Sequence, residues 1–218
     1  MHAACLQRWA FLCYDDQSGN ERRQRVRVVE KSLIKRLWLV VLLFVLMVGP
    51  GQAVEIKGVR FSDTVVVEQS VLELKGVAVL KWAMLFDVYA GALYLPRGVL
   101  GKSWSNDIPK RLELSYFREI EGKGFAEASD KLLQDTLLPA EYQALEKRLQ
   151  TFYGFFQDVK PGDRYSINYL PEKGTELRFN ENPLGYVPGA DFAAAYFGIW
   201  LGEEPISKGF RDRLLETD

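Results

Sequence analysis

The segment at residues 84–96, MLFDVYAGALYLP, carries the side chains best suited to binding chemistry. Tyr89 is followed by three small residues at 90–92 and then by a second tyrosine, Tyr94. Valine and aromatic residues favour a strand, and small residues inside a strand often mark close approach of a ligand or another backbone. Because side chains alternate between the two faces, Tyr89 shares a face with Gly91, while Tyr94 lies on the other. The segment predicts an apolar pocket in which Tyr89 offers a hydroxyl to the polar end of a guest.

Two cationic residues are candidates to bind that polar end. Residues 110–118 alternate as a strand, and Arg118 ends the apolar face that includes Tyr116. A guanidinium in this position could bind a carboxylate through two parallel hydrogen bonds. Lys81 is the other candidate. Each residue also has an ordinary interpretation, since Arg118 could pair with Glu119 at the surface and Lys81 could be a solvated lysine at a strand edge.

The composition excludes several kinds of catalysis. Both cysteines and the single histidine lie within the first 53 residues, so residues 54–218 contain neither type. This excludes Ser-His-Asp and Cys-His catalysis, the usual structural zinc sites and disulfides from that part of the chain. Acid–base chemistry would have to use Asp, Glu, Lys or Tyr. We expect no metal and no cofactor, and the sequence identifies no catalytic residue.

Charge argues against a nucleic-acid partner. The chain has 28 basic and 29 acidic residues, of which 8 and 4 precede Val54. The remaining 20 basic and 25 acidic residues give residues 54–218 a net charge of about −5. A mildly acidic domain lacks the broad basic surface that nucleic-acid binding requires.

Residues 34–53 have the pattern of a secretory signal. Lys35 and Arg36 precede an apolar run from Leu37 to Val48, and small residues follow up to Ala53. The run is shorter than the roughly 20 residues that span a membrane, so we expect cleavage after Ala53 and a periplasmic or secreted protein. The alternative is an uncleaved anchor, which would be the protein's only contact with a membrane.

Residues 1–33 are unusual in front of a signal because they include a long polar stretch. We interpret them as a misassigned start, with the true start near Val28 or Val29. The alternative is a disordered basic tail. Sequencing the N-terminus of the precursor tests this hypothesis, and a peptide from residues 1–27 would contradict it.

The pattern of elements in residues 54–218 predicts one α+β domain, because strands and helices come in separate runs. An apolar stripe from Leu138 to Phe156 predicts a helix that begins at Pro139 and packs its stripe into the core. The expected strands are 65–67, 71–79, 82–95, 110–118, 164–170, 175–179 and 185–187, and the expected helices are 125–136, 139–156, 191–201 and 205–215.

Three segments together resemble the chalcone isomerase-like family, in particular its bacterial exported branch. They are VYAGALYLP at 88–96, KPGDRYSINYLPEKGTEL at 160–177 and FAAAYFGIWLGEEPISKGFRDRLL at 192–215. The resemblance covers most of residues 56–216. It implies an open-faced β-sandwich, in which helices pack on one face of a large antiparallel sheet. The family includes enzymes that close chalcones to flavanones and relatives that bind fatty acids without known chemistry.

The resemblance also implies a ligand between the sheet and the helices. Its polar end would be held by a strand arginine and by a threonine or tyrosine on the next strand. Tyr89 matches the second position, but Leu80 stands where the arginine is expected. Lys81 follows one position later and therefore faces the other way, unless a bulge intervenes. Trp200 is either a core residue or a wall of the cavity.

These observations support three functions. The first is non-catalytic binding of a hydrophobic small molecule such as a fatty acid. The second is an isomerase of the chalcone isomerase type, which the absence of the arginine weakens. The third is a structural or interaction protein whose own side chains fill the pocket. The predicted ligand-binding residues are Tyr89, Lys81, Arg118, Tyr116 and Gly91.

Overall fold

The computed structural model describes residues 53–82 and 85–215. The predicted signal, its cleavage site and the alternative start concern residues 1–53, almost all of which lie outside the described residues. In the described part, no helix is both long enough and apolar enough to cross a membrane. The strands are β1 Ala53–Ile56, β2 Val59–Ser62, β3 Thr64–Val67, β4 Ser70–Trp82, β5 Phe86–Pro96, β6 Lys110–Tyr116, β7 Arg164–Leu170, β8 Gly174–Phe179 and β9 Asn182–Val187. The helices are α2 Gly122–Thr136, α3 Pro139–Tyr153, α4 Ala190–Leu201 and α5 Lys208–Leu215.

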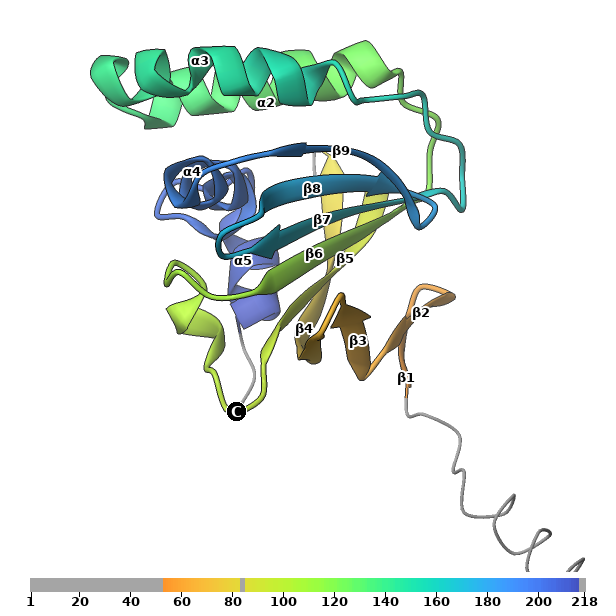
Figure 1. The fold of residues 1–218 in the computed structure, drawn as a ribbon. Helices are drawn as coiled ribbons and strands as arrows, with labels where there is room; N and C mark the ends of the chain where they lie inside the picture. Colours follow the sequence, from red (N-terminus) through yellow and green to blue (C-terminus); the bar gives the residue numbers. More distant parts are fainter. Residues whose placement is uncertain (1–52, 83–84, 216–218) are drawn as a thin grey trace, which may run out of the picture. The chain divides into compact units, whose positions relative to one another are not determined.

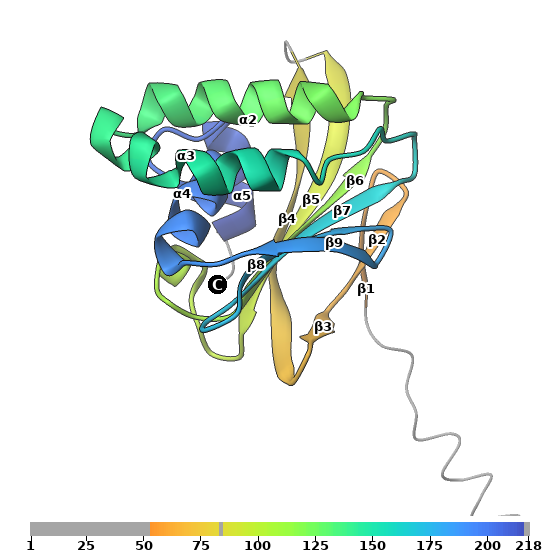
Figure 2. The same cartoon turned by 45° about the horizontal axis from the view of Figure 1, so that its top comes forward.

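Strands β3 to β9 form one antiparallel sheet in which sequence neighbours are also neighbours in space (Figure 1). The sheet curls, and four helices pack against its inner face, with α2 and α3 side by side (Figure 2). The main core fills the space between sheet and helices and contains Tyr89, Tyr116, Phe152 and Trp200. The fold is the expected α+β arrangement.

The other face of the sheet is partly covered by the hairpin of β1 and β2. Phe61 of β2 packs there with Ala90, Ala92 and Tyr94 in a second apolar cluster. Arg164 fastens this hairpin, because its guanidinium pairs with Glu113 of β6 and donates to the Arg60 carbonyl at 3.0 Å. Residues 53–82 and 85–215 belong to one compact unit, which contains both apolar clusters.

Several predicted boundaries need correction. Trp82 ends β4 instead of beginning the next strand, which starts at Phe86. The second helix ends at Tyr153, and the last helix begins at Lys208. Leu138 is 67% exposed, so the apolar stripe enters the core only from its middle onward, at Leu145, Leu149 and Phe152.

Gly76 is the point at which α5 meets the sheet. A shift in the pairing of β4 with β5 falls between Leu74 and Gly76. A Cβ on Gly76 would lie only 2.2 Å from the carbonyl oxygen of Arg213 and 2.7 Å from that of Leu214. The missing side chain therefore allows the backbone of α5 to lie directly on β4.

Lys110 is a buried cation beneath α4. Its Nζ donates to the Asn106 carbonyl at 2.8 Å and lies 5.0 Å and 5.8 Å from the ring centroids of Tyr169 and Phe197. Burial lowers the pKa of Lys110 to about 8, although Asp107 opposes the shift. The folded protein thus releases this proton at a lower pH than the unfolded chain does.

We therefore expect the free energy of unfolding to increase by about 1–2 kcal/mol from pH 7 to pH 9.5, because the unfolded chain binds more protons in that window. Urea unfolding of wild type and Lys110→Met measures this increase, which the variant should lose. Lys123→Met on the exposed surface of α2 is the control and should retain it. Equal pH dependence in wild type and Lys110→Met would contradict the assignment.

Candidate ligand-binding site

Tyr89 lies at the centre of the layer between sheet and helices. Its hydroxyl oxygen accepts a hydrogen bond of 2.9 Å from Nε1 of Trp200 in α4. Its ring makes edge contacts with Tyr116 and Phe210, at centroid distances of 5.5 Å and 5.6 Å. The side chain faces the helices, as the alternation in β5 predicts, and Tyr94 faces the second cluster. Trp200 thus belongs to the core and also contacts the candidate group.

The hydroxyl of Tyr89 is suited to donate a hydrogen bond. Burial raises the pKa of Tyr89 well above its ordinary value, and the hydrogen bond from Trp200 only partly offsets this. The group therefore stays protonated near neutral pH. Its oxygen accepts from Trp200, while no acceptor for its proton is found among the described residues. A carboxylate or another acceptor beside this hydroxyl would complete its hydrogen bonding.

The space beside Tyr89 is occupied by a side chain of the protein. A Cβ on Gly91 would lie 2.5 Å from Cζ of Phe210, so the ring of Phe210 lies directly on the glycine. Phe210 is itself buried. Gly91 does mark a close approach, as expected from the sequence, but the approaching group is an aromatic ring from α5.

Lys81 does not take the place of the expected arginine. Leu80 pairs with Tyr89 and Lys81 pairs with Asp87, so the extra residue of the bulge is Val88 in β5. Because the bulge lies in β5, Leu80 remains opposite Tyr89 and its side chain joins the main core. The side chain of Lys81 is 50% exposed and lies 3.9 Å from the Asp87 carboxylate.

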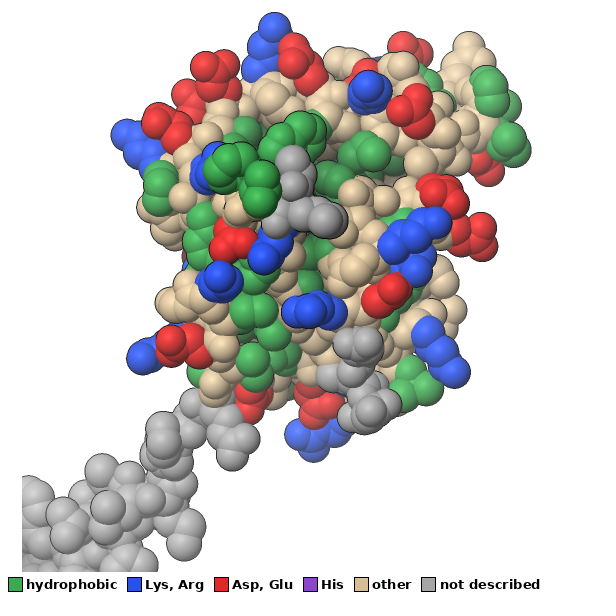
Figure 3. Space-filling view, turned by 180° about the vertical axis from the view of Figure 1, so that it is seen from behind, with side chains coloured by type: hydrophobic (Ala, Val, Ile, Leu, Met, Phe, Trp, Pro, Cys, Tyr) green, Lys and Arg blue, Asp and Glu red, His purple; other side chains and the backbone are tan. Residues whose placement is uncertain are grey.

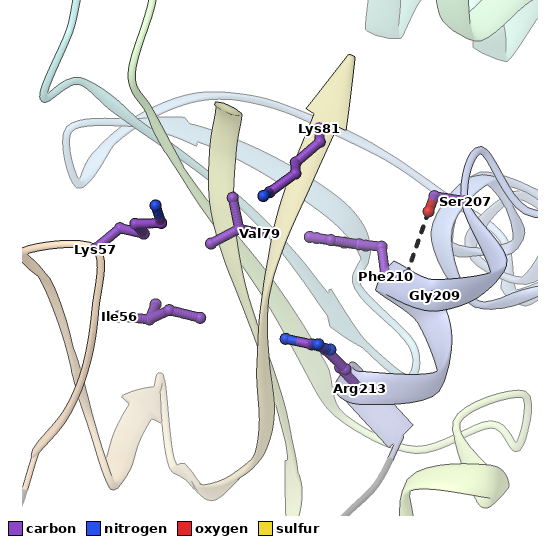
Figure 4. Close-up of a pocket in the computed structure, with 8 residues that line it drawn as sticks. All are labelled: Ile56, Lys57, Val79, Lys81, Ser207, Gly209, Phe210 and Arg213. Atoms are coloured by element: carbon purple, nitrogen blue, oxygen red, sulfur yellow. Dashed lines mark hydrogen bonds between the residues drawn. The ribbon is translucent and has the colours of Figure 1, made fainter. Parts of the chain in front are cut away.

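Lys81 instead lines a groove along the free edge of β4. Strand β3 pairs only with residues 70–73 of β4, which leaves the later part of β4 open on that side. The groove has a volume of about 620 Å³. Figure 4 shows it between the β1–β2 turn, β4 and α5. Its lining residues are Ile56, Lys57, Val79, Lys81, Ser207, Gly209, Phe210 and Arg213.

The groove combines a cationic rim with apolar walls. Lys57, Lys81 and Arg213 come from three separate elements and extend into the same space (Figure 4). Asp87 lies 3.3 Å from Lys57 and 3.9 Å from Lys81, so one carboxylate is shared by two ammonium groups. With Arg213 included, these four groups keep a net charge of two positive. Such a groove suits an anion that carries an apolar part.

Phe210 connects the groove with the buried tyrosine. Its ring lines the groove and also contacts Tyr89 and the Gly91 position. Its backbone N–H donates a hydrogen bond to the Ser207 hydroxyl at 3.3 Å, near the start of α5. The side chain of Phe210 therefore lies between the cationic groove and the ring of Tyr89.

Arg118 and Tyr116 occupy different places. Tyr116 is buried among the rings of Tyr89, Phe125 and Tyr165. Arg118 lies beyond the end of β6, where its Nε donates to the Asp87 carbonyl at 3.2 Å and its guanidinium stacks 4.7 Å from the Phe86 ring centroid. The structure therefore brings together Tyr89, Tyr116 and Gly91, but places Lys81 and Arg118 outside that layer.

Sequence reasoning missed Lys57, Phe210 and Arg213. Lys57 lies in the tight β1–β2 turn with a positive φ of 52°, and no strand was expected there. Phe210 and Arg213 lie three residues apart on a short helix. Their spacing predicts a shared helix side, but nothing in it indicates that this side meets β4.

The fold and the site define a class of protein. In this class a curled antiparallel sheet packs against a layer of helices, and Tyr89 and its neighbours lie between the two. Comparison with protein families identifies that class more closely, since the chalcone isomerase-like family model matches residues 53–216. The chain belongs to the chalcone isomerase-like family. No match was found among the curated proteins.

A solved structure with the same fold is that of a fatty-acid binding protein from Arabidopsis thaliana. The two chains are 17% identical and superpose with a TM-score of 0.60. The match covers 75% of this chain and 96% of the plant chain. At this identity the comparison shows a shared fold.

Proposed function

We propose that this protein binds a hydrophobic small molecule with an acidic end, such as a fatty acid, without transforming it. The observation that carries the proposal is the groove at the edge of β4, where Lys57, Lys81 and Arg213 surround apolar walls. The carboxylate would lie among these cations and the hydrocarbon chain along Ile56, Val79 and Phe210. The fatty-acid binding protein of the same fold supports the ligand class.

The surroundings of Tyr89 support binding over catalysis. Leu80 lies opposite Tyr89 where the family resemblance implies an arginine, so no guanidinium neutralises a phenolate at that point. Burial keeps Tyr89 protonated, which makes it a hydrogen-bond donor and not a base. In this proposal a ligand reaches Tyr89 only when Phe210 turns away.

Dodecanoate titration of residues 54–218 tests the proposal, with dodecanol as the uncharged control. We expect dodecanoate to bind at least about tenfold more tightly, because charge-assisted hydrogen bonds are stronger than neutral ones, although exposure of the lysines weakens their effect. Lys81→Gln/Arg213→Gln should lose this preference. Lys102→Gln/Lys131→Gln removes the same charge from two other exposed positions and should keep it.

Equal affinity for the acid and the alcohol would contradict the cationic site. Absence of binding by both would favour a second function, an interaction protein that fills its own pocket. The contact of Phe210 with the Gly91 position supports that alternative. A chalcone cyclisation assay completes the test, since acceleration above buffer would contradict the non-catalytic proposal.

We also propose export, with residues 34–53 as a signal removed after Ala53. The support is the sequence pattern of a basic start, a short apolar run and a small-residue exit. Sequencing the N-terminus of the mature protein should give Val54 as the first residue. A mature chain that retains residues 34–53 would instead indicate an anchor.

A further inference from the structure

The end of the β4–β5 hairpin exposes three large apolar side chains. Trp82 is 73% exposed, Leu85 is 79% exposed and Phe86 is 47% exposed. They lie on a tight turn, because the Leu85 N–H donates to the Trp82 carbonyl at 3.1 Å. Single exposed apolar residues are common, but a group of bulky ones on one turn marks an interaction surface. We call Trp82, Leu85 and Phe86 the hairpin tip.

Cationic residues lie next to the hairpin tip. The Arg118 guanidinium stacks on the ring of Phe86, and Lys81 directly precedes Trp82. The nearby Asp87 carboxylate is shared by Lys81 and Lys57, so it does not offset all of their charge. Figure 3 shows hydrophobic side chains gathered on this face with Lys and Arg side chains next to them.

We infer that the hairpin tip inserts into the surface of a bilayer that contains anionic lipids. Trp and Phe favour the boundary between headgroups and acyl chains. Lysine and arginine at the base of the tip can keep their stems against apolar surface while their charged ends reach lipid headgroups. The exposed apolar side chains of Trp82, Leu85 and Phe86, with cationic residues next to them, match both layers of such a surface.

This surface does not depend on the proposed fatty-acid site. The tip consists of side chains that do not line the groove, and its partner is the lipid layer and not a single bound acid. The two features share Lys57 and Lys81, so the groove opens close to the base of the tip. The inference therefore gives the folded domain its own contact with a membrane. This contact is separate from the membrane contact that an uncleaved signal segment would make.

Vesicle sedimentation of residues 54–218 tests the inference. The vesicles are phosphatidylcholine alone, or three parts phosphatidylcholine to one part phosphatidylglycerol, without free fatty acid. We expect at least about tenfold stronger partitioning to the anionic vesicles at low ionic strength, and most of that difference should disappear in about 0.5 M salt. Equal partitioning to both vesicles, or none, would overturn the inference.

Matched variants distinguish binding through the hairpin tip from the effect of removing any exposed apolar or cationic side chain. Trp82→Ser/Leu85→Ser should reduce partitioning about tenfold or more, whereas Leu138→Ser removes a leucine that is also more than half exposed, before the start of α3, and should not reduce it. Arg118→Gln should weaken binding to the anionic vesicles and leave binding to phosphatidylcholine vesicles unchanged. Lys123→Gln on α2 should leave binding to both kinds of vesicle unchanged.

Circular dichroism shows whether each variant is folded. Because the substituted side chains are exposed, we expect all of them to fold. Sedimentation velocity distinguishes a second copy of the chain as the partner. A wild-type dimer that Trp82→Ser/Leu85→Ser dissociates, without any vesicle binding, would overturn the membrane assignment. The affinity of Trp82→Ser/Leu85→Ser for dodecanoate should equal that of wild type. A failure of the membrane inference can therefore be distinguished from a failure of the fatty-acid proposal.

Discussion

Phe210→Ala is expected to lower the free energy of unfolding by about 3–5 kcal/mol and to leave a cavity beside Tyr89. The ring of Phe210 is buried, lies directly on Gly91 and contacts Tyr89 at a centroid distance of 5.6 Å. Its removal costs the transfer free energy of the ring and the lost contacts of the residues that surround it. Urea unfolding monitored by circular dichroism measures the loss.

The cavity left by this substitution should accept a small aromatic molecule. We expect toluene to raise the melting temperature of Phe210→Ala, because a ligand that binds only the folded state stabilises it. Wild type and Phe210→Leu should not respond, since both keep most of the volume filled. A folded Phe210→Ala that toluene does not stabilise would show that α5 collapses onto Gly91, and would contradict the role of Phe210 as the separator between groove and tyrosine.

Gly76→Ala is expected to displace the end of α5 and to lower the free energy of unfolding by about 2–4 kcal/mol. The new Cβ would lie 2.2 Å from the Arg213 carbonyl oxygen and 2.7 Å from that of Leu214. Both obstacles are backbone atoms, so a side-chain rotation cannot relieve the overlap. The helix must move, and the burial of Leu214 is lost with it.

A matched control for this substitution is Gly198→Ala in α4. Among the described residues, no atom beyond its chain neighbours and the backbone of α4 lies within 4 Å of the position that its Cβ would take. Alanine favours helices over glycine by about 1 kcal/mol, so this variant should be slightly stabilised. The two substitutions are chemically identical but should have opposite signs in urea unfolding. A neutral Gly76→Ala would contradict the direct contact between α5 and β4.

Local patterns in the sequence determined most of the fold and the orientation of Tyr89. Alternation in β5 placed Tyr89 and Tyr94 on opposite faces, because the face of a strand residue follows from its position among near neighbours in the chain. The order of strands and helices gave the α+β class for a similar reason. The family resemblance, which rests on ordered segments, was confirmed by the family match.

The tertiary structure alone decided what lies beside Tyr89. The small residues at 90–92 predicted a close approach, but only the packing of α5 shows that Phe210 makes it. Phe210 is more than a hundred residues away in sequence, and no local periodicity encodes such a contact. The position of Lys81 depended in the same way on a bulge in the neighbouring strand, at Val88.

The cationic groove could not be predicted from the sequence either. Lys57, Lys81 and Arg213 come from a turn, a strand and a helix, and only the fold brings them to one edge of β4. The sequence by itself determined which side chains are available: a tyrosine beside small residues, and no histidine or cysteine after Ala53. The tertiary structure decided which of them meet, because long-range packing and not local pattern sets the neighbours of each face.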